Sequence, residues 1–223
     1  MRQVSLWDVD DVDTFGPVSQ MTVGSVEQID VREFCRRWHY TGAGGSALWN
    51  YGLYDGEVLV GVVTYNLPTR RACASVFGEQ HVDKVAHMGR LVCADDAPRN
   101  SESRLIALSL KSLAVDQPHL WAVLTFAAQD EGHIGYVYQA TNAVYTGTGG
   151  YTKTYLRADG TQMSTNGKCG PDEIKRLLAN GGRIVNALPK HRYVYILGTP
   201  AQRRERRQLL KLPSLPYPKA VSA

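Results

Sequence analysis

The chain has 223 residues, of which 43% are hydrophobic and 21% charged, and its formal net charge is +4. This composition is that of a globular domain and excludes a disordered, collagen-like or coiled-coil chain. The longest apolar runs are about nine residues, too short for a membrane-spanning helix, and the aspartate-rich N-terminus is not a secretory signal. The widely spaced cysteines predict neither a zinc site nor a disulfide framework, and they favour a reducing cytoplasm: Cys35, Cys73, Cys93 and Cys169.

Positive charge is concentrated at the C-terminal end. Residues 190–223 carry eight Lys and Arg against one Glu, whereas residues 1–189 carry 17 against 20 acidic residues. A near-neutral body with a basic end is typical of nucleic-acid binding, and a solvated tail is the alternative. The densest cluster consists of Arg203, Arg204, Arg206 and Arg207.

The predicted elements alternate between helix and strand. Acidic residues 1–25 are expected to form an arm or an edge element. Apolar spacing near 3.6 residues predicts a helix over 26–40, and Asp55-Gly56 predicts a hairpin turn. The elements that follow the first helix are a Gly-rich loop at 41–46, strands at 47–54, 57–67 and 84–93, and a helix from about 101 to 114.

The second half begins with a continuous apolar run at 121–128, which predicts a strand buried on both faces. After it we expect a loop with a short helix (132–146), a hairpin (151–156 with 161–164), a helix (171–180) and a final strand (191–198). This order predicts a single mixed α/β domain, in which antiparallel strands precede a helix and a central strand.

Three clusters could carry chemistry. His39, where the first helix meets the Gly-rich loop, is either a general base or metal ligand, or a capping residue packed beside Trp38. Asp130 directly follows the apolar strand, a position that lines ligand crevices in open α/β sheets. Tyr138 and Tyr145 are seven residues apart and would share a helix face, either in the core or as a surface on which a base stacks.

Several motifs in order resemble one family. They are WHYTG, VGVVTYNLPTR, HMGRLV, RNSESRLIALSL, LTFAAQDEGHIGYVYQATNAVYTG and KHRYVYIL, which together span about residues 30–198. This series resembles the Mom family of phage DNA adenine-modification proteins. The resemblance implies a fold similar to the GCN5-related N-acetyltransferases. It also implies conversion of adenine in double-stranded DNA to an N6-carbamoylmethyl derivative, in the cytoplasm of an infected bacterial host, which protects the phage DNA from restriction.

The resemblance also implies particular site residues. It assigns a functional pair to His39 and Tyr40, an acid to Asp130 and a further tyrosine to Tyr138. It leaves open an iron ion held by His39, Tyr40 and Asp130, and a homodimer. The chain is expected to comprise an acidic N-terminal segment (1–25), an acetyltransferase-like catalytic domain (26–200) and a basic, Pro-containing C-terminal tail (201–223). The arginines of this tail would hold DNA phosphates.

One departure concerns the group donor. Acetyltransferases of this fold hold the pyrophosphate of coenzyme A on a Gly-rich turn before a helix, but Glu102 and Arg104 stand where glycines belong. Arg99, Ser101 and Ser103 could still donate hydrogen bonds to a phosphate. The donor is therefore either a coenzyme A thioester or an aminoacyl-tRNA. The competing functions are a generic N-acetyltransferase and a non-catalytic DNA-binding protein.

Overall fold

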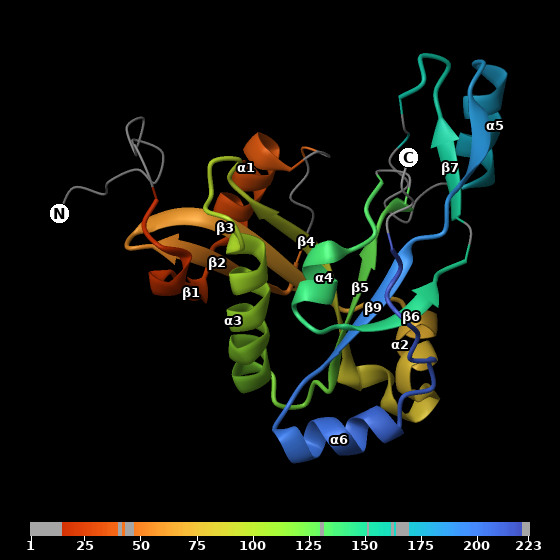
Figure 1. The fold of residues 1–223 in the computed structure, drawn as a ribbon. Coiled ribbons are helices and arrows are strands. Elements are labelled where there is room, and N and C mark those ends of the chain that lie inside the picture. Colours follow the sequence, from red (N-terminus) through yellow and green to blue (C-terminus); the bar gives the residue numbers. More distant parts are fainter. Residues whose placement is uncertain are drawn as a thin grey trace.

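A computed structural model describes residues 15–39, 42, 47–129, 132–150, 152–161, 163 and 170–219. These residues form a seven-stranded sheet with helices on both faces, and a separate two-stranded sheet at one side (Figure 1). In chain order, the strands of the large sheet are β1 (Thr22–Ser25), β2 (Trp49–Asp55), β3 (Val58–Asn66), β4 (Val85–Cys93), β5 (Ala122–Ala127), β6 (Val144–Thr148) and β9 (His191–Ile196). Their spatial order is β1-β2-β3-β4-β5-β9-β6, and β4 and β5 are the one parallel pair among these strands.

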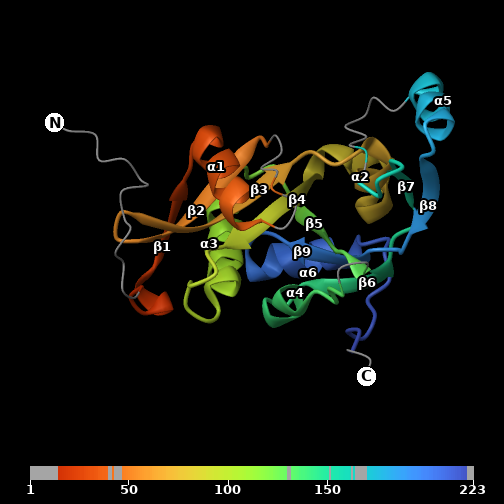
Figure 2. The same cartoon turned by 90° about the horizontal axis from the view of Figure 1, so that it is seen from above.

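The mixed α/β class predicted from the sequence is confirmed by the helices that cover this sheet. They are α1 (Gln28–Trp38), α2 (Arg70–Phe77), α3 (Ser101–Asp116), α4 (Tyr136–Ala140), α5 (Pro171–Ala179) and α6 (Pro200–Gln208), with short 3-10 helices η1 (Val18–Gln20) and η2 (Glu79–Lys84). Figure 2 shows α1 and α2 on one face and α3 and α4 on the other. Within the described residues, no helix combines the length and apolarity needed to cross a bilayer.

Strand β5 is buried on both faces, as its continuous apolar sequence predicts. Ala122 and Leu124 pack in the core under α2, whereas Val123 packs in the core under α3 with Leu105. Because successive side chains on a strand point to opposite faces, both sets must be apolar. The alternation ties the two halves of the core together at the centre of the sheet.

Strands β4 and β5 separate soon after they meet. Their register covers three residue pairs, from Val85 with Ala122 to His87 with Leu124. Beyond it, β4 carries a bulge, because Thr64 pairs with Arg90 and Tyr65 pairs with Met88, which leaves Gly89 as an extra residue. The Arg90 backbone N–H donates to the Thr64 hydroxyl at 2.9 Å. A bulge bends its strand, so β4 turns away from β5 at this point.

The expected hairpin of 151–156 with 161–164 is confirmed at its turn, where the Arg157 N–H donates to the Thr161 carbonyl and the Met163 N–H donates to the Tyr155 carbonyl, each at 2.8 Å. The first of these segments also pairs with a later strand, which the sequence did not predict. Strand β7 (Thr152–Leu156) pairs with β8 (Arg183–Ala187), and α5 packs beside them. We call the described residues between 152 and 187 the arm, since they extend from the ends of β6 and β9 away from the large sheet (Figure 1). A sequence pattern detects the local turn but not a partner some thirty residues away.

The C-terminal residues pack against the sheet. After α6, the Lys211 N–H donates to the Val76 carbonyl at 2.8 Å, and the Leu215 N–H donates to the Tyr145 carbonyl at 2.9 Å. We call residues 209–219 the strap. Helix α6 is fixed by Arg206, whose guanidinium lies 5.4 Å from the ring centroid of Trp121 and donates to the Leu197 carbonyl at 2.8 Å.

These contacts predict that neighbouring arginines of α6 differ in their effect on stability. We expect Arg206→Gln to lower the free energy of unfolding by about 1–2 kcal/mol, because it removes a cation–π contact and a charged hydrogen bond. The exposed Arg207→Gln should change it by less than about 0.5 kcal/mol. Urea denaturation of both variants measures the difference, and equal effects would contradict a structural role for Arg206.

Candidate active site

A cavity of about 760 Å³ lies where β4 and β5 separate. Its lining comes from six parts of the chain: the end of α1 (Trp38, His39), β4 (residues 87–92), Glu102 in α3, β5 and the residue after it (126–128), the segment 132–138 that leads into α4, and Lys190. Because α1 and α4 cover opposite faces of the sheet, the cavity is walled from both faces (Figure 2). Such a cavity can admit two molecules from different sides.

Two uncharged histidines line this cavity. His39 follows the last residue of α1, and His87 lies in β4 with its ring 5.8 Å from that of Phe126. The pKa of both histidines is lowered to about 4, mainly by burial. The positive charge of Arg90 also contributes at His39, and the charges of Lys190 and Arg90 contribute at His87. Both imidazoles are therefore neutral at pH 7 and able to accept a proton.

The structure brings together some of the predicted site residues. His39 and Tyr138 both line the cavity, although they come from opposite faces of the sheet. Tyr40 and Asp130 lie outside the described residues; His39, Ala128 and Gly132, which are within two residues of them in the chain, are lining residues, whereas Gln129 is not. Sequence reasoning did not single out His87, Arg90 or Lys190, although the first two belong to the HMGRLV motif.

The YQATN motif secures one wall of the cavity. The Gln139 side-chain amide donates to the carbonyl of Ile134 and to the Tyr193 hydroxyl, each at 3.1 Å, and Tyr193 itself donates to Ile134. Gly135 has φ of +79°, and a Cβ there would lie 2.6 Å from the Tyr193 ring. The lining segment 132–135 is therefore held against β9 by side chains that do not themselves line the cavity.

Tyr138 and Tyr145 do not share a helix face, contrary to the spacing argument. Tyr138 lies in α4 with its ring 5.4 Å from that of Tyr193, whereas Tyr145 lies in β6 and its hydroxyl is 3.0 Å from Nδ1 of His191. The chain turns between them at Asn142, which has φ of +62°. A left-handed residue follows the helix, which ends after little more than one turn. The seven-residue spacing therefore does not place Tyr138 and Tyr145 on one helix face.

The start of α3 is already engaged in the fold. The buried Ser101 hydroxyl donates to the Pro98 carbonyl at 2.6 Å, and the Arg104 guanidinium donates to the carbonyls of Met21 and Ser19. Of the predicted phosphate contacts, Arg99 is exposed and Ser103 is partly exposed. Glu102 lines the cavity beside this turn. Of the three predicted phosphate contacts, the Ser101 hydroxyl is therefore already engaged by the fold.

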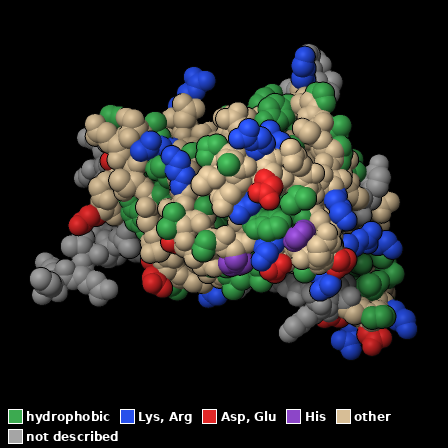
Figure 3. All heavy atoms as spheres, turned by 90° about the horizontal axis from the view of Figure 1, so that it is seen from below, with side chains coloured by type: hydrophobic (Ala, Val, Ile, Leu, Met, Phe, Trp, Pro, Cys, Tyr) green, Lys and Arg blue, Asp and Glu red, His purple; other side chains and the backbone are tan. Residues whose placement is uncertain are grey.

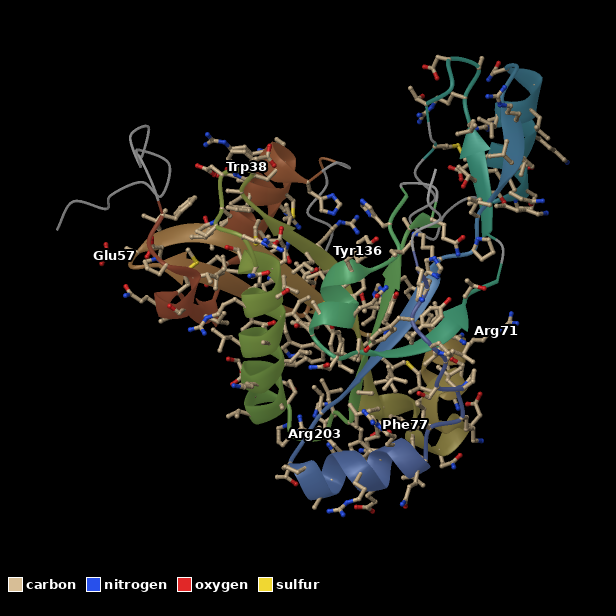
Figure 4. The ribbon with its side chains drawn as sticks, in the orientation of Figure 1. Trp38, Glu57, Arg71, Phe77, Tyr136 and Arg203 are labelled. Atoms are coloured by element: carbon tan, nitrogen blue, oxygen red, sulfur yellow. The ribbon has the colours of Figure 1, made fainter. Side chains whose placement is uncertain are left out.

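The basic helix and the cavity lie at opposite ends of the molecule. Figure 4 shows Trp38 and Tyr136 towards the arm and Arg203 at the far end. Arg203, Arg204 and Arg207 line a second cavity of about 1100 Å³ between α3 and α6, together with Lys111. Figure 3 views the molecule from the α6 end and shows Lys and Arg side chains spread over that face among acidic residues.

Nothing in the described part of the chain forms a cluster suited to iron. Groups of three or more His, Cys, Asp or Glu that could hold a metal do not occur among the described residues. His39, the described member of the expected ligand set, has the cation Arg90 as its charged neighbour, which opposes a bound metal ion.

The pKa of His87 predicts a pH-dependent stability. Its folded pKa of about 4 lies below the value of 6.5 for a free histidine, so the unfolded chain binds the extra proton between these values. Stability should therefore fall as the pH drops from 6.5 towards 4. His87→Gln should remove about 2 kcal/mol of this loss, measured by urea denaturation at several pH values. Parallel pH curves for the two proteins would contradict a buried neutral His87, and the exposed His119→Gln serves as control.

Comparisons with known proteins identify the family. The model of the Mom protein family matches residues 20–219. The chain is 31% identical over 178 residues to the methylcarbamoylase Mom of Escherichia phage Mu, covering 75% of this chain and 70% of that protein. Similar solved structures include a spermidine N-acetyltransferase mutant from Vibrio cholerae (13% identity, TM-score 0.47, 80% of this chain and 94% of that one). Another is the ribosomal-protein-S18-alanine N-acetyltransferase from Escherichia coli (10% identity, TM-score 0.46, 80% and 95%). The chain belongs to the Mom protein family, and it is an enzyme of the transferase class.

Proposed function

We propose that this transferase adds a carbamoylmethyl group to N6 of adenine in double-stranded DNA, with the target base flipped into the β4–β5 cavity. The observation that carries the proposal is a cavity walled from both faces of the sheet and lined by two neutral histidines. The similarity to a phage Mu methylcarbamoylase supports the group transferred. A modified adenine would then be a poor substrate for restriction enzymes of the host.

The acceptor chemistry requires a base. The lone pair of the adenine amine is delocalised into the ring, so the amine needs to lose a proton as it attacks. In the proposed step, the N6 lone pair attacks the carbonyl carbon of a glycyl group on the donor, and the thiolate or the tRNA ribose oxygen departs with its electron pair. The N6-glycyl product carries the same C2H3NO unit as the carbamoylmethyl product and rearranges to it. His39, neutral at pH 7, accepts the N6 proton. A base inside a duplex is out of reach of such a group, which is why flipping is part of the proposal.

Other residues orient the reactants. Tyr138, held against Tyr193, offers an aromatic wall to the base. Tyr40 and Asp130 complete the proposed set on the strength of their places in the chain, and Asp130 is the alternative proton acceptor. On the donor side, Arg99 and Ser103 are the proposed contacts to a phosphate of a coenzyme A thioester. An aminoacyl-tRNA is the alternative donor.

Expression in bacteria tests the function. We expect mass spectrometry of nucleosides from the cell's DNA to show a deoxyadenosine heavier by one C2H3NO unit. His39→Asn, which keeps a polar side chain of similar size, should retain DNA binding and lower the product by about 100-fold or more. His119→Asn, on the exposed surface, should leave the product unchanged.

The outcomes separate the competing functions. Acetylated small molecules or proteins with unmodified DNA would indicate a generic N-acetyltransferase. DNA binding without a modified nucleoside, in wild-type and His39→Asn alike, would indicate a non-catalytic binding protein. Full product from His39→Asn would remove His39 from the mechanism and leave Asp130 as the base. Product formed in vitro from a coenzyme A thioester without tRNA would settle the donor.

A further inference from the structure

We infer that the substrate duplex lies across the mouth of the β4–β5 cavity, held between the end of α1 and the arm, and that α6 does not hold it. This inference rests on the proposed function, because it concerns the DNA that delivers the base. A flipped base remains attached to its own backbone, so its flanking phosphates must lie next to the mouth. The basic residues around the mouth are therefore the ones to consider.

One side of the mouth is the last turn of α1. Arg36 and Arg37 lie in this turn, and both are exposed. The guanidinium of Arg37 lies 4.8 Å from the ring centroid of Trp38, and Trp38 lines the cavity. This turn therefore places two cations directly beside the lining residues, where backbone phosphates would pass.

The other side is the arm. Lys190 lines the cavity and is exposed, and it connects β8 to β9 at the base of the arm. In the arm, Lys153 pairs with Asn186 and Tyr155 pairs with Ile184, so these four side chains share one face. Lys153, Asn186 and Ile184 are exposed, which identifies this face as open. A lysine and a tyrosine on an open strand face suit a phosphate backbone and an unstacked base.

The arm carries a net positive charge, as contact with DNA phosphates requires. Its described residues together with Lys190 carry six Lys and Arg against three Asp and Glu. Within the cavity, Arg90 and Lys190 extend this positive field inwards, against Glu102 among the described lining residues. Positive charge at the rim and inside the cavity would attract the phosphate next to the extruded nucleotide.

The position of α6 argues against it as the duplex site. In Figure 1, α1 and the arm extend towards the same end of the molecule, and α6 crosses the opposite end. Arg206 is used by the fold, as its contacts with Trp121 and Leu197 show. The remaining arginines line the separate cavity beside α3. The density of positive charge in the sequence predicted that this helix binds DNA phosphates. Charge density, however, does not indicate how far a residue lies from the reacting base.

Two triple variants with equal loss of charge test the inference. The first is Arg36→Gln, Lys153→Gln and Lys190→Gln, around the mouth. The second is Arg203→Gln, Arg204→Gln and Arg207→Gln, on α6. Fluorescence anisotropy with a short duplex at several salt concentrations gives the slope of log affinity against log salt, and circular dichroism confirms that both variants fold.

We expect the mouth variant to lower the magnitude of this slope by about 2–3, since each lost phosphate contact contributes about 0.9. The α6 variant should keep the wild-type slope. A reduced slope for the α6 variant, alone or together with the mouth variant, would overturn the inference, as would wild-type slopes for both. Failure of the wild-type chain to bind duplex DNA would instead count against the proposed function itself.

Discussion

The separation of β4 from β5 after three residue pairs is the constraint on which the site depends. Each strand stays paired with its other neighbour, β3 or β9, beyond this point, so the sheet stays continuous while a gap opens at its centre. The bulge at Gly89 bends β4, and a Cβ at this residue would lie 3.1 Å from the Thr64 hydroxyl oxygen. The gap is useful because helices on both faces wall it, and apolar packing around β5 keeps its two sides in fixed positions.

Burial then sets the chemistry of that gap. Burial in the same apolar surroundings that stabilise the core lowers the pKa of His39 and His87, so both side chains are uncharged at pH 7. The nearby cations also lower these pKa values, Arg90 at both histidines and Lys190 at His87. In the proposed reaction, the neutral bases would accept a proton from the adenine amine, and the positive groups would attract the phosphates of the DNA that carries it. The hydrogen-bonded pair of Gln139 and Tyr193 holds segment 132–135, which lines the cavity. Gln139 also donates a hydrogen bond to the Pro218 carbonyl in the strap. The C-terminal residues therefore support the site from outside it.

The sequence predicts local features well and distant pairings poorly. The buried strand at β5, the Asp55-Gly56 turn and the helices α1, α3 and α5 follow from apolar spacing and turn residues. The partner of β7 and the docking of α6 through Arg206 depend on contacts between distant residues, so no local pattern reveals them. The site shows the same division: His39 and Tyr138 stand in recognisable motifs, but the location of the basic helix relative to the cavity is a property of the folded chain. In the YQATN motif, Tyr138 lines the cavity, whereas Gln139 has a structural role and holds the cavity wall at Ile134.

Photocrosslinking tests most directly the claim that the reacting base occupies the β4–β5 cavity. A duplex with a photoreactive adenine analogue at the target position would be irradiated with the wild-type chain, and the crosslinked peptide identified by mass spectrometry. The account predicts crosslinks to peptides that contain residues 87–92 or 132–138, which line the cavity from opposite sides. Crosslinks confined to residues 199–211, around α6, would contradict it.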